Sequence, residues 1–248
     1  MNRTLTAILL GLGLSAAAMA QPAAETKKFP AFNAETGKDL WTYPPSPVVD
    51  FIHMKLVLDI PDMNTPRATA EQTLTVAAIG KPVDSLTLDA HLLEIADVKC
   101  EGHAAKFTTD GSTLTISFDP PLAAGVKTDI VTRYTINDPP QGFLWTPETP
   151  AWPGRPAQIH TQGQAETNSY WFPCHDFPNE RQTTELIVTV PAGYLVSSNG
   201  REAEAVKHSG SRDTFHWLQD KPHVNYLVTL VIGKFDVVDV AGPGSRVP

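Results

Sequence analysis

The side chains best suited to chemistry lie together in the segment GQAETNSYWFPCHD, which runs from residue 163 to residue 176. Its end places Cys174, His175 and Asp176 side by side, directly after two aromatic residues and a proline. Such side chains can ligate a metal ion, and a cysteine with a histidine can act as a nucleophile with its base. The segment therefore raises two chemical hypotheses, a metal site and a nucleophile, and a third in which it is scaffold.

The spacing of these residues argues against both chemical hypotheses. Neighbouring side chains of an extended segment point in opposite directions, so at most two of the three could share one ion. The sequence has no C-x2-4-C or H-x3-5-H pair of the kind that structural zinc uses, and no H-E-x-x-H. Catalytic Cys–His pairs meet in space, and Pro173 disfavours a helix beginning at Cys174. We therefore expect neither metal ligands nor catalytic residues in this chain.

The scaffold hypothesis explains the aromatic and proline residues but does not explain two glutamines that precede them. It buries the apolar side chains and uses the prolines to fix a turn; these residues are Trp171, Phe172, Pro173, Cys174 and Pro178. It gives no role to Gln162 and Gln164, which lie just upstream.

The elements that must position this segment have the periodicity of strands. In FIHMKLVLDI the apolar residues Ile52, Met54, Leu56, Leu58 and Ile60 share one face, as they would in a strand. Similar short segments follow at roughly the spacing of an antiparallel sandwich. The D-G dipeptide in TDGST predicts a hairpin turn at residues 109–113, and LVTLVIG, residues 227–233, predicts a buried central strand.

One stretch interrupts the strand pattern. Residues 137–159 hold six prolines and two tryptophans, which is too much proline for a central strand. We expect a long ordered loop there, packed by Phe143, Trp145 and Trp152. No amphipathic helix is expected after residue 20, so the sequence predicts an all-β fold of two packed sheets.

The first residues have the pattern of a secretory signal. Residues 1–20 comprise a positive start at Arg3, an apolar run and an A-M-A cleavage site, which predicts cleavage after Ala20 and a periplasmic or secreted protein. The run is shorter than the ~20 residues that span a bilayer, and no membrane span is expected after cleavage. Removal changes the net charge from -8 to -9, and this acidity argues against nucleic acid as a partner. Residues 21–47 are interpreted as a leader.

The segment TQGQAETNSYWFPCHDFPNERQTTELIVTVPAGYLVSSNG resembles the N-terminal domain of the aminopeptidase N family of zinc metallopeptidases, which includes leukotriene hydrolase. Two motifs carry the resemblance, a T-Q-x-[EQ]-A segment at residues 161–165 and an F-P-C-x-D-x-P segment at residues 172–178. The likeness covers about residues 48–240 and implies a saddle-like antiparallel β-sandwich. In that family the domain packs on a thermolysin-like catalytic domain.

The resemblance also assigns a role to the two glutamines. It implies that Gln164 helps to bind the free α-amino group of a peptide substrate, with Gln162 as a supporting neighbour. A side-chain carbonyl can accept a hydrogen bond from an ammonium group, and a buried ammonium needs such partners. Gln164 is neutral where some members have glutamate, and residues 167–169 are Thr-Asn-Ser where the family commonly has an arginine.

The catalytic motifs of the family, G-x-M-E-N and H-E-x-x-H, do not occur in this sequence. The resemblance therefore implies that zinc belongs to the parent enzyme only, and that residues 241–248 begin a linker to a catalytic domain. We expect this chain to be inactive alone. The resemblance also implies that Cys174 is a buried packing residue, so we expect no disulfide between Cys174 and Cys100.

A second class of function stays open from the sequence. A freestanding β-sandwich could bind a peptide or a glycan through its tryptophans, Trp145, Trp152 and Trp171, because exposed aromatic rings suit that role.

Overall fold

The computed structural model describes Glu35, Thr36 and residues 47–238. The expected signal peptide at 1–20, nearly all of the leader at 21–47 and the linker at 241–248 lie outside these residues. All of the strands belong to one compact unit of the chain. The described part contains two 3-10 helices and no α-helix, so the predicted all-β class is confirmed. Accordingly, none of its helices is long and apolar enough to cross a membrane.

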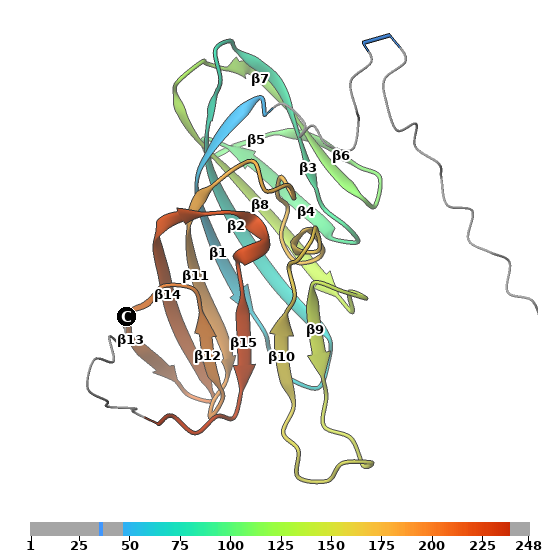
Figure 1. Cartoon of the computed structure of the whole chain (residues 1–248), viewed down its shortest axis with the longest axis vertical. Coiled ribbons are helices and arrows are strands. Elements are labelled where there is room, and N and C mark those ends of the chain that lie inside the picture. The colour runs from blue at the N-terminus through green and yellow to red at the C-terminus, as the bar shows by residue number, and fades with distance from the viewer. Residues whose placement is uncertain (1–34, 37–46, 239–248) are drawn as a thin grey trace, which may run out of the picture. The chain divides into compact units, whose positions relative to one another are not determined.

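The largest sheet has eight strands in the order β13-β14-β11-β1-β2-β8-β4-β5 (Figure 1). Every neighbouring pair in it is antiparallel except β1 and β11, which run parallel. Its strands are β1 (Val49–Asp59), β2 (Arg67–Ala78), β4 (Glu94–Cys100), β5 (His103–Ala104), β8 (Lys127–Asn137), β11 (Gln182–Pro191), β13 (Arg201–Ser209) and β14 (Arg212–His223).

Two smaller antiparallel sheets accompany the large one. In Figure 1 the four-stranded sheet, in the order β12-β15-β10-β9, lies in the lower half and the three-stranded sheet, β3-β7-β6, in the upper half. Their elements are β3 (Val83–Asp89), β6 (Lys106–Thr109), β7 (Thr113–Leu122), β9 (Phe143–Thr146), β10 (Gln158–Thr161), β12 (Leu195–Ser198) and β15 (Leu230–Gly233). The 3-10 helices are η1 (Asn168–Tyr170) and η2 (Asn225–Leu227).

One cluster of buried side chains joins the three sheets. Leu56 of the large sheet, Ile116 of the three-stranded sheet and Ile232 of the four-stranded sheet all belong to it, and each is fully buried. Each sheet therefore buries one face, which is why its strands alternate in polarity. The prediction of two packed sheets was incomplete, because two separate small sheets pack with the large one.

β1 follows the predicted alternation except near its start. Met54, Leu56 and Leu58 are fully buried, as expected. The register with β2 shifts between Phe51 and His53, so Phe51 takes a buried position and Ile52 is only half-buried. The prediction that Ile52 faces the core was wrong, because an extra residue in one strand moves the side chains beyond it to the opposite face.

Of two other local predictions, the hairpin turn is confirmed and the buried central strand is confirmed in part. Residues 109–113 form a turn between β6 and β7, in which Asp110 accepts hydrogen bonds from the backbone of Ser112 and Thr113. Gly111 has φ of +86°, a conformation that favours glycine. In the apolar LVTLVIG segment only Leu230–Gly233 form a strand, β15, which lies between β12 and β10 in the four-stranded sheet. Leu227 belongs to η2 and is 50% exposed, so the first part of the prediction was wrong.

The proline-rich stretch is a hairpin rather than a loop throughout. β9 and β10 pair across it, and all six prolines lie outside these two strands. Phe143 is buried and Trp145 packs against the core, but Trp152 is 64% exposed and stacks with Arg155, whose guanidinium lies 4.9 Å from the ring centre. The prediction that Trp152 packs the loop was wrong, because the hairpin carries it away from the apolar cluster.

Candidate functional site after strand β10

The two predicted glutamines lie on the short loop that joins β10 to η1. Gln162 and Gln164 are both exposed, and the Gln162 side-chain amide donates to the Gln164 backbone carbonyl at 3.4 Å. The Gln164 side chain has no hydrogen-bond partner among the described residues. The structure therefore brings both residues into one loop and leaves the Gln164 amide free to bind a ligand.

The loop is held against a turn that precedes β9. The backbone N–H of Gln162 donates to the carbonyl of Gly142 at 2.9 Å. Gly142 has φ of +79°, and a Cβ there would lie 2.1 Å from the Thr167 carbonyl oxygen. The Thr167 backbone N–H donates to Gly163 at 3.1 Å, and its hydroxyl donates to the Gln162 carbonyl. Gly142 is thus required both by its conformation and by close packing.

A buried asparagine ties the other side of the loop to η2. Asn168 is fully buried; its amide donates to the carbonyls of Asn225 and Val228, and its oxygen accepts from the Trp171 indole at 2.7 Å. A Cβ on Gly163 would lie 2.7 Å from both polar atoms of the Asn168 side chain. The loop therefore has little freedom to move, which preorganises Gln164.

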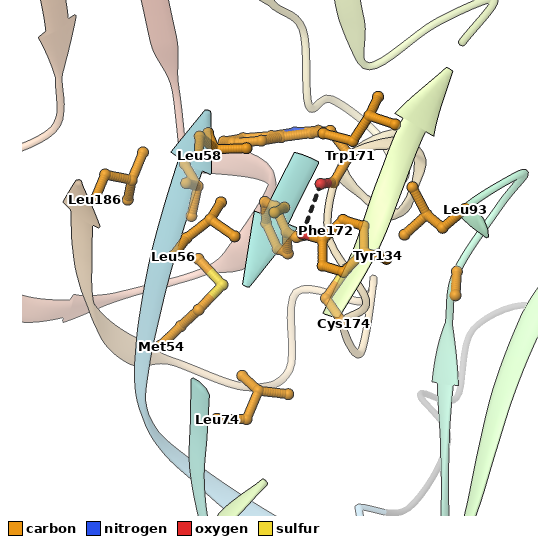
Figure 2. Packing of buried hydrophobic residues seen from close by; sticks show 14 of the residues in the cluster. Met54, Leu56, Leu58, Leu74, Leu93, Tyr134, Trp171, Phe172, Cys174 and Leu186 are labelled. Atoms are coloured by element: carbon orange, nitrogen blue, oxygen red, sulfur yellow. Dashed lines mark hydrogen bonds between the residues drawn. The ribbon is translucent and has the colours of Figure 1, made fainter. Parts of the chain in front are cut away.

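The Phe-Pro-Cys segment is scaffold, as the third hypothesis predicted. Trp171 and Phe172 are fully buried and Cys174 is 1% exposed (Figure 2). The backbone of this segment is bonded into the core: the Gln72 amide donates to the Pro173 carbonyl at 2.7 Å, and the Tyr134 hydroxyl donates to the Trp171 carbonyl at 2.9 Å. Burial raises the pKa of the Cys174 thiol well above its ordinary value, which disfavours the thiolate that a nucleophile needs.

Cys174, His175 and Asp176 do not form a common site. Cys174 makes backbone bonds to Asp89, and the His175 ring hydrogen-bonds to Asn179 at 2.7 Å. Asp176 accepts from the backbone N–H of Ser169 at 3.0 Å. No group of three His, Cys, Asp or Glu side chains in the described ranges could hold a metal ion.

Sequence reasoning missed the polar contacts that support this segment from β11 and η2. The Asn225 amide donates to the His175 carbonyl at 2.6 Å, and the Gln182 amide donates to the Asn225 side-chain oxygen at 2.7 Å. Asn225 is 6% exposed and Gln182 is 3% exposed. The available signal was a polar residue inside an apolar run, in VNYLV, because a buried amide in such a run needs partners.

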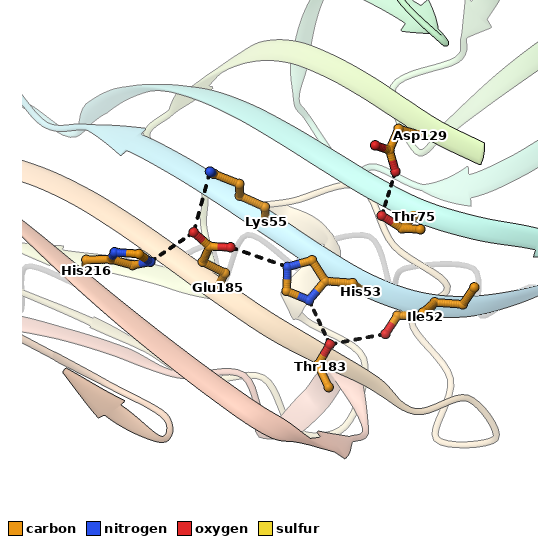
Figure 3. A network of polar contacts seen from close by, with 8 residues as sticks. All are labelled: Ile52, His53, Lys55, Thr75, Asp129, Thr183, Glu185 and His216. Carbon is orange, nitrogen blue, oxygen red and sulfur yellow. Dashed lines mark hydrogen bonds and ion pairs between the residues drawn. The ribbon is translucent and has the colours of Figure 1, made fainter. Parts of the chain in front are cut away.

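A second polar network, on the large sheet, was also missed. Figure 3 shows Glu185 of β11 between His53 and Lys55 of β1 and His216 of β14. His216 Nε2 lies 2.9 Å from Glu185 Oε1, an ion-pair distance without the alignment of a hydrogen bond. Lys55 Nζ lies 3.5 Å from the same oxygen. These residues lie on three different strands, and the pairing registers of β1 with β11 and of β11 with β14 bring them together.

Comparison with known proteins identifies the family to which the domain and its β10–η1 loop belong. A model of the peptidase M1 N-terminal domain matches residues 52–227. The chain belongs to this family. The M1 match confirms the relationship to the aminopeptidases that the two motifs indicated, and it includes both glutamines and the scaffold segment.

Curated relatives match over part of their length. The human aminopeptidase RNPEPL1 is 33% identical over 141 residues, which is 57% of this chain and 19% of the relative. Human aminopeptidase B is 32% identical over 142 residues, 57% of this chain and 21% of the relative. The chain thus matches about a fifth of these relatives. Transcription initiation factor TFIID subunit 2 of Gallus gallus is 33% identical over 85 residues, 34% of this chain and 7% of the relative.

Solved structures share the fold. The M1 zinc metallopeptidase of Deinococcus radiodurans aligns with a TM-score of 0.65 at 22% identity, covering 75% of this chain and 42% of that one. Yeast LTA4 hydrolase aligns with a TM-score of 0.66 at 18% identity, covering 77% of this chain and 30% of that one. The fold is therefore shared with these structures at 18% and 22% sequence identity.

Proposed function

We propose that this M1 N-terminal domain is the substrate-binding and structural part of an exported zinc aminopeptidase, which removes N-terminal residues from peptides. Family membership supports the proposal, as do the relatives that are named as aminopeptidases. The peptide chemistry belongs to a thermolysin-like catalytic domain that packs beside this one. The domain alone is inactive, because its own contribution is to bind and orient the substrate.

The observation that carries the proposal is the free Gln164 side chain on a rigid loop. Its amide has no described partner, while the backbone around it is fixed by Gly142, Gly163 and Asn168. A preorganised carbonyl oxygen can accept a hydrogen bond from the ammonium of a peptide N-terminus without ordering the loop first. Gln162 supports it by donating to the Gln164 backbone carbonyl.

Zinc does not fit the residues described here. No three of their His, Cys, Asp and Glu side chains are grouped so that they could hold an ion. We therefore assign the metal to the catalytic domain. The side chains of this domain bind and position the substrate amine, and the packed aromatic segment holds them in place.

The proposal is tested by Gln164→Ala in the full-length parent. Loss of one hydrogen bond to a charged group costs about 1.5–3 kcal/mol, so kcat/KM should fall about ten- to a hundred-fold. Zinc content and fold should be unchanged. Acylation of the substrate amine should abolish the difference between variant and wild type.

Gln141→Ala is the matched control, because Gln141 is another exposed glutamine close to the same turn. It should leave kcat/KM unchanged. A Gln164→Ala enzyme that matches wild type on free-amine peptides would show that Gln164 is not the amine-binding residue.

A freestanding binding module remains the alternative, supported by the exposed Trp152. It is weakened because Trp171 is fully buried and cannot stack on a ligand. The DNA after codon 248 separates the two proposals. An open frame with G-x-M-E-N and H-E-x-x-H supports the aminopeptidase, and a natural stop codon favours the module.

Export is proposed from the signal pattern of residues 1–20. Mass spectrometry of the protein from its native host should find a chain that starts at Gln21. A soluble cytoplasmic protein that retains Met1 would refute this part of the proposal.

A further inference from the structure

The loop that carries the two glutamines begins at Thr161, the last residue of β10. β10 lies between β9 and β15 in the four-stranded sheet (Figure 1). Its pairing with β9 continues as far as Thr161, which lies opposite Phe143. Its pairing with β15 ends one residue earlier, at His160 opposite Val231. Thr161 is therefore the residue at which the chain leaves β15 and turns into the loop.

The side chain of Thr161 continues the contact with β15 where the main-chain pairing stops. Its hydroxyl oxygen accepts a hydrogen bond from the backbone N–H of Leu230 at 2.8 Å. The same hydroxyl donates to the hydroxyl of Thr229 at 3.2 Å. Leu230 is fully buried, so its N–H needs an acceptor within the protein. The Thr161 hydroxyl supplies that acceptor.

The partner of this contact is itself held in place from the other side. The backbone N–H of Thr229 donates to the Asn199 side-chain oxygen at 2.7 Å, and its carbonyl accepts from the Ser198 hydroxyl at 2.7 Å. Ser198 is the last residue of β12, the other neighbour of β15 in the sheet. Thr161 thus joins the loop to a part of the sheet that is already bonded to its second neighbour.

The next residue fixes the opposite side of the chain. Gln162 donates its backbone N–H to the Gly142 carbonyl at 2.9 Å. Thr161 and Gln162 therefore bond the start of the loop to β15 on one side and to the turn before β9 on the other. Gln164 follows only two residues later, so a displacement at Thr161 would be carried to its side chain.

We propose that Thr161 is a positioning residue for Gln164, and that its hydroxyl sets the place of the Gln164 amide through the bond to Leu230. This inference rests on the proposed function, in which Gln164 binds the ammonium group of the substrate. Thr161 acts on the substrate through Gln164. The T-Q-x-[EQ]-A segment then combines a threonine that fixes the loop with a glutamine that binds the ligand.

The first test is Thr161→Val in the full-length parent, which replaces the hydroxyl by a methyl group of similar size. KM for free-amine peptides should rise about three- to tenfold with kcat unchanged, as expected for the loss of one intramolecular hydrogen bond. Thr161→Ser keeps the hydroxyl and should retain the wild-type KM. Thr146→Val is the matched control, a half-buried threonine of β9 that lies opposite the other end of β10. It should leave KM unchanged.

A double-mutant cycle separates positioning from a merely structural role. In the Gln164→Ala background, Thr161→Val should cause no further rise in KM, because the amide that it positions is gone. A further rise as large as that in the wild-type background would overturn the proposal, and so would a Thr161→Ser enzyme as impaired as Thr161→Val. A Gln164→Ala enzyme with wild-type kinetics would instead refute the proposed function. An effect of Gln164→Ala without one of Thr161→Val would refute only the positioning role.

Hydrogen exchange in the 248-residue chain tests the contact without catalysis. Thr161→Val should speed exchange of the Gln162 and Thr167 amides about fivefold, since both belong to the bonds that hold the loop and local opening sets their exchange. Thr161→Ser should leave both rates at the wild-type value. Thr161→Ala, which removes the hydroxyl and adds no methyl group in its place, carries the test if Thr161→Val does not fold. Unchanged exchange of both amides in the variants without the hydroxyl would overturn the proposal.

Discussion

At the scale of single residues, buried amides do most to set the geometry around Gln164. Asn168 satisfies two carbonyls of the η2 segment and one indole N–H, so each of its polar atoms is used. Asn225 also uses both polar atoms of its side chain: its nitrogen donates to the His175 carbonyl, and its oxygen accepts from the Gln182 amide. Both asparagines use every polar atom of their side chains, whereas Gln182 Oε1 is buried without a partner among the described residues. Satisfied buried amides specify one arrangement of the chain. The exposed glutamine is therefore positioned by buried polar residues as well as by apolar packing.

Asp176 should make stability depend on pH in a defined direction. Burial raises its pKa above the usual 3.8, with hydrogen bonds from Ser169 opposing. The folded protein thus holds this proton more tightly than the unfolded chain. Its contribution to stability is present below the unfolded pKa and is lost as the pH rises through the folded pKa. Asp176→Asn, which does not titrate, should therefore gain stability relative to wild type as the pH rises above the usual pKa of 3.8.

Urea unfolding of both proteins at a series of pH values measures this difference. Asp220→Asn, which removes an exposed carboxylate of β14, corrects for the change in net charge. A difference between wild type and Asp176→Asn that stays constant across the range would contradict the prediction.

At the scale of elements, the loop after β10 is fixed by contacts that leave no room for a side chain. A Cβ on Gly163 would lie 2.5 Å from the Tyr226 carbonyl oxygen, which is backbone and cannot move aside as a side-chain end would. Gly163→Ala should therefore destabilise the domain by about 1–3 kcal/mol, and in the parent enzyme it should raise KM by shifting Gln164.

The unfolding midpoint and the kinetics of the parent measure the two effects of Gly163→Ala. Ala165→Ser is the matched control, because it adds one atom at an exposed position of the same loop. An unchanged midpoint for Gly163→Ala would show that the loop adapts more easily than its contacts indicate.

The sequence predicted the strands well because alternation is a local property. The alternating positions of Met54, Leu56 and Leu58 predicted the buried face of β1, and the dipeptide Asp110-Gly111 predicted the turn after β6. The bulge after Phe51 and the pairing of β9 with β10 could not be read from alternation, because each depends on the register with a partner strand and not on the polarity of one segment.

For the site, the sequence resemblance singled out Gln162 and Gln164, and the structure shows both on the loop after β10. Their proposed role as substrate-binding residues stays a prediction. The supports from Asn168 to η2 and the network around Glu185 were not predictable, since each joins residues of different strands or helices. Only the tertiary register decides whether such polar residues meet.

At the scale of the whole molecule, the core is stabilised by apolar packing, without a disulfide between Cys100 and Cys174. Cys174 is 1% exposed and Cys100 is half-buried, and both are free thiols in the structure. Burial raises the pKa of both thiols, with the charge of Glu101 adding to the effect at Cys100. Reagent access should therefore decide their order of reaction.

A thiol-specific reagent, used without reductant, should label Cys100 slowly in the native protein and Cys174 only after unfolding. Two thiols should be counted in denaturant, and one in the Cys100→Ser variant. A count of zero in the denatured wild type would reveal a disulfide and contradict the prediction.

The parallel pairing of β1 with β11 has a consequence for the order of folding. His53 lies opposite Thr183, 130 residues further along the chain, so the centre of the large sheet closes between distant parts of the sequence. Until β11 has been synthesised, β1 can pair only with β2, and its other edge is open to wrong partners. Contacts of such long sequence separation slow folding, because the entropy of closing the loop is lost before they form. A nascent chain that ends before residue 182 should therefore be the species most in need of a chaperone.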